Sequence, residues 1–181
     1  MKRLQLRRKA NPVAGCHRCF GAVINESQVH EFSVISEIDP GSGVYLRGVQ
    51  EDKVTDLLIT VTSILNENGF EMPKERVTIT VNGFSYSWDA SMLSLPIAVS
   101  LYALLPDVLI SSDDFFLCGD LSLSGELRDV KEASALSAYA GKGGRRIFLP
   151  KMQYLSCLST YQADVIPADS FKEIITHLDQ F

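Results

Sequence analysis

The sequence predicts a mixed α/β fold, and three observations support this prediction. Two β-rich runs between residues 19 and 38 flank a polar turn at 25–27, which is typical of a hairpin. Apolar residues recur at three- and four-residue steps over 50–68, which predicts an amphipathic helix. After residue 115, short apolar runs alternate with helical patterns. Because strands and helices alternate late but not early, we expect a mixed sheet packed with helices rather than a doubly wound one.

The first half of the chain contains the clearest elements. A turn cluster at 40–43 precedes a short predicted strand at 44–46. The 50–68 helix is expected to end at Gly69, which suits a left-handed closing residue. Alternation over 75–81 predicts a half-buried strand. The apolar stripe of the helix comprises Val54, Leu57, Leu58, Val61, Ile64 and Leu65.

The second half is predicted to be a series of shorter elements. A buried helix is expected over 91–105, where Pro96 is tolerable only in the first turns. A strand at 115–120 and a turn at 124–125 should follow. Thereafter we expect a helix at 131–140, a strand at 147–149, a helix at 152–158, a strand at 164–166 and a helix at 170–178.

Length and charge indicate one domain with a basic end. The 181 residues fit a single domain over 16–181, preceded by a flexible arm over 1–15. The arm holds five positive charges, and without them the chain has 12 basic residues against 22 acidic ones. An acidic body is a poor surface for phosphates, so nucleic-acid binding would have to use the arm. No apolar run reaches the ~18 residues of a membrane span, and no export signal follows the arm, so a cytoplasmic protein is expected.

Cys16 and Cys19 have the spacing of half a zinc site. A closed site needs a second ligand pair, and the sequence has no second CxxC, CxxH or HxxxH. The two residues are therefore weak metal-ligand candidates. The preferred interpretation is that all four cysteines are free, with Cys118 and Cys157 buried as small apolar side chains.

Four stretches together resemble a known family. Residues 119–130, GDLSLSGELRDV, resemble the strand and turn of Lon-type proteolytic domains, in the version found in magnesium-chelatase-related ATPases of the ComM/YifB type and, more distantly, in RadA. Residues 44–49, 68–81 and 95–98 resemble further family stretches in the same order. The resemblance covers about residues 18–180. It implies a Lon proteolytic-domain-like fold, shared with a ribosomal-protein domain.

The same resemblance implies that the catalytic pair of Lon is missing. Lon cleaves peptides with a serine at a helix start and a desolvated lysine as its base. By position, Met92 replaces the serine and Ser134 replaces the lysine. Ser91 and Lys131 lie close in sequence and are fallback candidates. A neighbour is a poor substitute, because one residue turns a helical side chain by roughly 100°.

No cofactor is expected, because the sequence contains no GxxxxGK[ST] phosphate loop. The resemblance implies an accessory module that pairs with an AAA+ ATPase partner or with itself, with a link to DNA processing. A residual Ser/Lys peptidase and nucleic-acid binding through the basic arm remain as alternatives.

Phe84, Tyr86 and Trp88 alternate along a loop between predicted elements. Alternation would place the three aromatic side chains on one side of an extended segment. They are core residues in one interpretation and a contact patch for a partner in the other.

Overall fold

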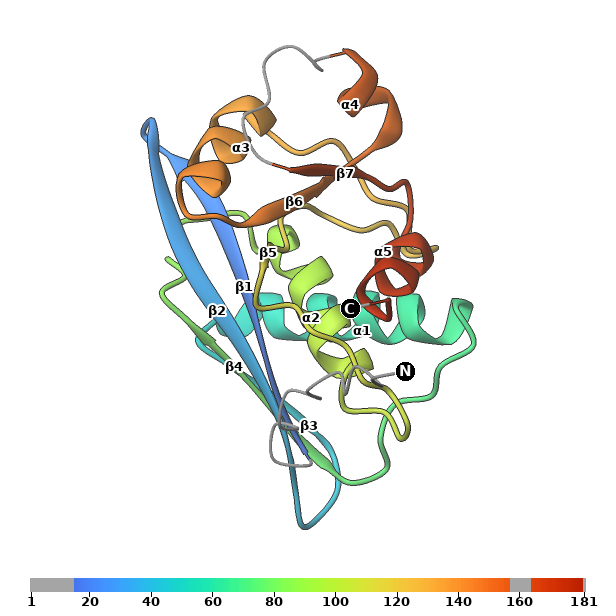
Figure 1. Cartoon of the computed structure of the whole chain (residues 1–181). Helices are drawn as coiled ribbons and strands as arrows, with labels where there is room; N and C mark the ends of the chain where they lie inside the picture. Colours follow the sequence, from blue (N-terminus) through green and yellow to red (C-terminus); the bar gives the residue numbers. More distant parts are fainter. Residues whose placement is uncertain (1–14, 157–163, 181) are drawn as a thin grey trace, which may run out of the picture.

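The fold is a mixed sheet packed with helices, as a computed structural model describes it for residues 15–156 and 164–180 (Figure 1). In that part of the chain, seven strands form one sheet in the order β3-β4-β2-β1-β5-β6-β7. The predicted mixed α/β class is confirmed. The strands are β1 (Cys16–Asn25), β2 (Gln28–Asp39), β3 (Val44–Arg47), β4 (Arg76–Asn82), β5 (Phe115–Phe116), β6 (Arg146–Leu149) and β7 (Val165–Pro167).

The sheet has an antiparallel centre of β4, β2 and β1 with parallel pairing on both sides, and β3 pairs parallel with β4 at one end. β2 pairs antiparallel with both β1 and β4, and the predicted hairpin closes through Glu26 and Ser27, which both have positive φ. Positive φ at both central residues matches the right-handed twist of the flanking strands. β5, β6 and β7 continue from β1 in parallel. The helices provide the crossovers that parallel strands require.

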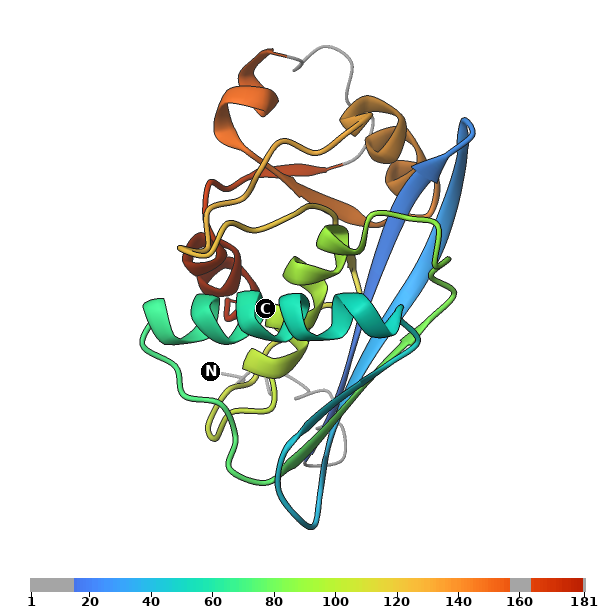
Figure 2. The same cartoon turned by 180° about the vertical axis from the view of Figure 1, so that it is seen from behind.

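The helices are α1 (Glu51–Glu67), α2 (Ser94–Tyr102), α3 (Ala133–Lys142), α4 (Lys151–Ser156) and α5 (Phe171–Leu178), with a 3₁₀ turn, η1 (Ala90–Leu93), before α2. In both views α1 and α2 lie on one side of the antiparallel strands β1, β2 and β4 (Figures 1 and 2). The other side of these strands carries no helix along most of their length (Figures 1 and 2). The main core lies between the sheet and the helices α1, α2 and α5. A smaller core lies between α3 and strands β1, β5 and β6.

Most predicted boundaries hold to within two residues. The helix expected over 91–105 is shorter, because a 3₁₀ turn replaces its first residues and α2 ends at Tyr102. Other differences have local causes. The strand expected at 115–120 is only Phe115–Phe116 long, because the chain turns at Gly119 with φ +127°. The helix expected from residue 131 begins at Ala133, because Glu132 has a left-handed φ of +51°. Pro96 is the third residue of α2, where no helical hydrogen bond is lost. The last residues of the helix expected at 152–158, and Cys157, lie outside the described residues.

Two glycines with nearly equal φ differ in the space around them. Gly48, after β3, has φ +82°, and a Cβ there would lie 2.0 Å from the Val81 carbonyl oxygen. Gly69, after α1, has φ +83° and nothing within 4 Å of its Cβ position. The pair separates the cost of a left-handed backbone from the cost of a clash.

We predict that Gly69→Ala lowers the free energy of unfolding by about 1 kcal/mol, which is the cost of a left-handed alanine. Gly48→Ala should cost at least about 2 kcal/mol more, because the β3–β4 pairing must open to admit the methyl group. Urea unfolding followed by circular dichroism measures both values. Equal losses in the two variants would contradict the close approach of β3 and β4 at Gly48.

Candidate functional site

The position that matches the Lon nucleophile lies in the turn that leads into α2. Asp89 begins this turn by accepting a hydrogen bond from the Ser91 backbone N–H at 3.1 Å. Met92 is half-buried and packs against the main core. A thioether has no acidic proton and is no acyl-transfer nucleophile. The apolar side chain of Met92 therefore lies at the position where the resemblance would require a hydroxyl.

The position that matches the Lon base lies in the first turn of α3. Ser134 is exposed there, and Lys131 is exposed in the segment just before the helix. A lysine serves as a base when burial strips its hydration, and exposure leaves Lys131 solvated. Although both residues are described, no hydrogen bond joins the Ser91 hydroxyl to the Lys131 amine. The structure thus does not bring the fallback pair together.

The start of α2 makes a set of hydrogen bonds that the sequence analysis missed. We call this set, which joins Ser94 to Asp120 and Leu121, the clasp. Ser94, the first residue of α2, is fully buried. Its Oγ accepts the Leu121 backbone N–H at 2.8 Å and donates to the Asp120 carboxylate at 3.2 Å. The other Asp120 oxygen accepts from Arg128 Nη1 at 2.9 Å. The clasp joins α2 to the 119–128 turn, whose sequence carries the family resemblance.

The 119–128 turn also contacts the end of α1 and the start of α5. Gly125, with φ +85°, lies where a Cβ would be 3.0 Å from Asn68 Nδ2 and 3.4 Å from Phe171 Cβ. Its carbonyl accepts the Phe171 N–H at 2.7 Å. The end of α1, the start of α2 and the start of α5 therefore meet at this one turn. Its role is structural, because each of its polar groups named here is used in holding elements together.

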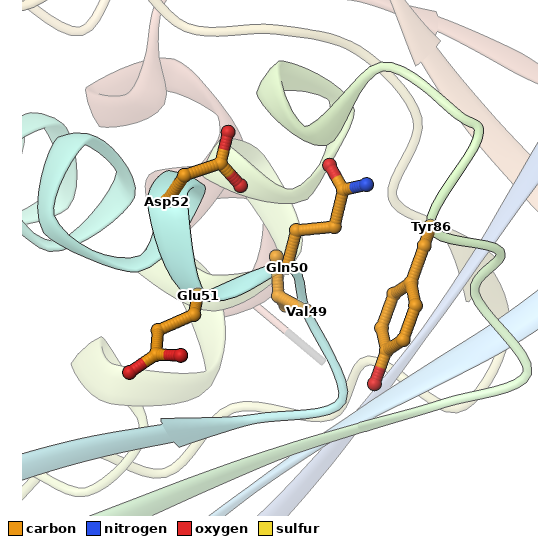
Figure 3. A pocket seen from close by; sticks show the side chains of 5 residues that line it. All are labelled: Val49, Gln50, Glu51, Asp52 and Tyr86. Carbon is orange, nitrogen blue, oxygen red and sulfur yellow. The ribbon is translucent and has the colours of Figure 1, made fainter.

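A surface groove lies beside η1, between the start of α1 and the loop after β4 (Figure 3). This open hollow of about 760 Å³, which we call the Tyr86 groove, is lined by Val49, Gln50, Glu51, Asp52 and Tyr86. In Figure 3 the Gln50 side chain extends toward the segment that carries Tyr86, and the Glu51 side chain points away from Tyr86. The Asp52 carboxylate lies on the other side of Gln50 from Tyr86. The space beneath, among Phe84, Trp88 and Ala90, has no room for water. The groove therefore lies directly on packed side chains.

The three aromatic residues beside the groove do not share one side of the chain, contrary to the expectation from their alternation. The loop turns where the Trp88 N–H bonds to the Ser85 carbonyl at 3.1 Å. Phe84 and Trp88 pack edge-to-face at 5.2 Å and contact the core, and Phe84 also meets Phe32 at 5.2 Å. Tyr86 is 60% exposed. Two of the aromatic side chains are therefore partly buried against the core, and the third is exposed to solvent.

Cys16 and Cys19 do not form half of a metal site. Both lie on β1, and residues three apart on a strand point to opposite faces. Cys16 contacts Glu37 on one face at 3.7 Å, whereas Cys19 is fully buried on the other, 3.5 Å from Ser112 Oγ. Within the described ranges no group of three His, Cys, Asp or Glu side chains is placed to hold a metal ion.

Burial also makes the cysteines of the described residues poor nucleophiles. Desolvation raises the pKa of Cys19 and of Cys118 to about 12, and it raises the pKa of Cys16 as well. The thiolate is the reactive form, so a raised pKa lowers reactivity at neutral pH. Cys16 is only partly buried and keeps some access to solvent.

In a Cys157→Ser background, we predict that iodoacetamide at pH 7.5 modifies the native protein slowly and only at Cys16, because Cys19 and Cys118 are both buried and protonated. Peptide mass spectrometry locates the adducts. The same treatment in 6 M urea should label all three cysteines and serves as the positive control. A native-state adduct at Cys118 would contradict the packing of α3 over β5.

We predict that Ser94→Ala lowers the free energy of unfolding by about 1–3 kcal/mol, because it leaves the buried Leu121 N–H and the Asp120 carboxylate short of a partner. The matched change Ser91→Ala, on the half-buried η1 turn, should cost less than about 0.5 kcal/mol. Thermal and urea unfolding test the pair. Equal, small losses would show that the clasp adds nothing to stability.

Within residues 15–156 and 164–180, no helix has both the length and the apolar character to cross a membrane.

Comparisons with known proteins show which family the chain is similar to. Residues 34–153, about two thirds of the chain, match the family described as "ChlI: Subunit ChlI of Mg-chelatase". The chain is 30% identical over 110 residues to "Uncharacterized protein YifB" of Escherichia coli, covering 60% of this chain and 22% of that protein. It is also 30% identical over 108 residues to the YifB of Salmonella typhimurium, covering 59% and 21%. The matched part thus spans about a fifth of these relatives. On the extent of the first match, the chain belongs to the magnesium-chelatase-related ChlI family.

Proposed function

We propose that this chain is a non-catalytic, Lon proteolytic-domain-like module that acts through protein contacts beside a magnesium-chelatase-type ATPase. The observation that carries the proposal is the pair of replacements at the two positions that matter for peptide cleavage. Met92 supplies a half-buried thioether in place of a hydroxyl, and Ser134 supplies an exposed alcohol in place of a desolvated amine. Acyl transfer needs a nucleophile and a base within hydrogen-bond reach.

Three further observations favour a contact role over a chemical one. The buried hydroxyl nearest the vacated position, that of Ser94, is committed to the clasp with Asp120 and Leu121. The sequence carries no phosphate loop of the GxxxxGK[ST] type, so nucleotide hydrolysis has to come from elsewhere. The YifB relatives are several times longer than the matched part, which leaves room in them for further modules.

Two measurements on the purified chain test the proposal together. Incubation with a fluorophosphonate probe and with unfolded casein should give neither labelling nor cleavage, for the wild type and for Ser91→Ala alike. A commercial serine protease in parallel controls the reagents. Titration calorimetry against a magnesium-chelatase-type ATPase of the same organism, with light scattering for self-association, should detect binding.

The two halves of the proposal fail separately. Labelling at Ser91 with cleavage lost in Ser91→Ala would establish a peptidase and overturn the non-catalytic assignment. Absence of both ATPase binding and self-association would overturn the contact role.

A further inference from the structure

We propose that the Tyr86 groove binds an extended basic peptide segment of a partner protein, with an apolar side chain seated between Val49 and Tyr86 and Lys or Arg side chains reaching the acidic rim. This inference rests on the proposed contact role and adds the surface and the chemistry of the partner.

The first support is the shape of the groove. Two hollows of the surface adjoin each other here and share Val49, Gln50 and Tyr86 in their linings. The upper hollow is open to solvent, and the lower one is filled by packed side chains. A segment can therefore lie on a firm surface without having to open the core.

The second support is the way Tyr86 is held. Its ring is 60% exposed, yet it rises from a loop fixed by the Phe84–Trp88 contact and by the contact of Trp88 with His30 at 5.0 Å. An exposed aromatic ring on a pre-ordered base loses little conformational freedom on binding, which is the character of an interface anchor. A tyrosine ring also attracts the cationic head of Lys or Arg.

The third support is the charge of the groove walls. The residues that line the two hollows include two carboxylates, those of Glu51 and Asp52, against the single amine of Lys53. Asp89 follows Tyr86 by three residues in the same loop. The Lys53 amine lies 3.4 Å from Asp52 and is partly neutralised by it. Electrostatic complementarity steers partners of the opposite sign and repels those of the same sign. A phosphate backbone is therefore disfavoured here, and a basic segment is favoured.

The start of α1 adds polar contacts that suit a peptide. Its N-cap residue, Gln50, makes no side-chain capping hydrogen bond, although its side chain reaches across the groove (Figure 3). The first backbone N–H groups of a helix have no partner within the helix. The Lys53 N–H already bonds to the Gln50 carbonyl at 3.0 Å, so the donors left for a peptide carbonyl are those of Glu51 and Asp52. The Gln50 amide can bond to the same peptide backbone.

The test uses a fluorescein-labelled peptide of five Leu-Arg repeats as the probe and a peptide of five Leu-Glu repeats as its charge-reversed control. Fluorescence anisotropy with the full chain should show saturable binding of the first peptide only. Tyr86→Ala should weaken that binding by about tenfold or more, as loss of an anchor does. Tyr86→Phe keeps the ring and should bind like the wild type. Circular dichroism confirms that each variant folds.

A matched pair of charge variants separates the groove from the general acidity of the protein. Glu51→Gln with Asp52→Asn removes two charges at the groove, and we expect a loss of about fivefold or more. Glu67→Gln with Glu71→Gln removes two exposed charges at the opposite end of α1, about 25 Å away at 1.5 Å per residue, and should change binding less than twofold.

Several outcomes overturn the inference while leaving the contact role in place. Equal effects of the two double variants would reduce the binding to net charge. A dimer of this chain, or binding of a 20-nucleotide single strand, that Tyr86→Ala abolishes would assign the groove to a second copy or to nucleic acid instead. ATPase binding that is unchanged in Tyr86→Ala would place the partner surface elsewhere, whereas absence of any such binding in the wild type concerns the proposed function itself.

Discussion

The complete burial of α2 is the constraint on which the rest of the structure depends. All nine of its residues are buried, and the sheet, α1 and the C-terminal half pack around it. A helix buried on every side has no solvent at its ends, so the polar groups near its start need partners within the protein. Two serines on α2 serve buried contacts: Ser94 holds the 119–128 turn, and Ser100 meets Ser36 of β2 at 2.7 Å. The helix is thereby bonded to β2 and to the 119–128 turn.

The same arrangement gives the family-like 119–128 turn a part in holding the structure together. The strand and turn at 119–128 resemble the family signature, yet their polar groups hold α1, α2 and α5 together. The signature therefore has a structural reason to exist that is independent of any nucleophile. Met92 strengthens the same packing, since a half-buried thioether contributes contact area where a serine would contribute little. The packing of this fold does not determine its function, because a fold alone does not imply an activity.

The sequence predicted an element well where apolar periodicity determines its bounds, and less well where contacts with distant parts of the chain determine them. The stripe from Val54 to Leu65 is long enough to be unambiguous, and α1 begins and ends within a residue of the prediction. β5 was predicted too long because nothing local to 115–120 shows that the chain turns away at Gly119, whose φ is +127°. Ser94 was missed because a serine in an apolar stretch looks like a tolerated small residue. Its position directly before the family-like 95–98 stretch was the available signal.

The candidate site was predictable only in part, for two reasons. The zinc hypothesis depended on where the strand begins: the sequence indicated a strand from residue 19, whereas β1 begins at Cys16, and there a spacing of three puts the two thiols on opposite faces. The aromatic loop could not be resolved from its sequence, because the Ser85–Trp88 turn reverses the alternation that the pattern suggested. The groove combines residues 49–52 with residue 86, and only the packing of α1 against the loop after β4 brings these distant stretches together.

The exposure of Tyr86 is informative because the same loop buries its other rings. A segment that turns Phe84 and Trp88 inward satisfies the hydrophobic effect at those positions, and a polar side chain at residue 86 would serve the fold equally well. Single exposed aromatics are common and need no explanation by themselves. Here the ring borders an open hollow of the surface, beside an acidic helix start. The carboxylates of that helix start already offset its positive dipole end. The stability of the domain does not require that combination, whereas recognition of a basic partner does.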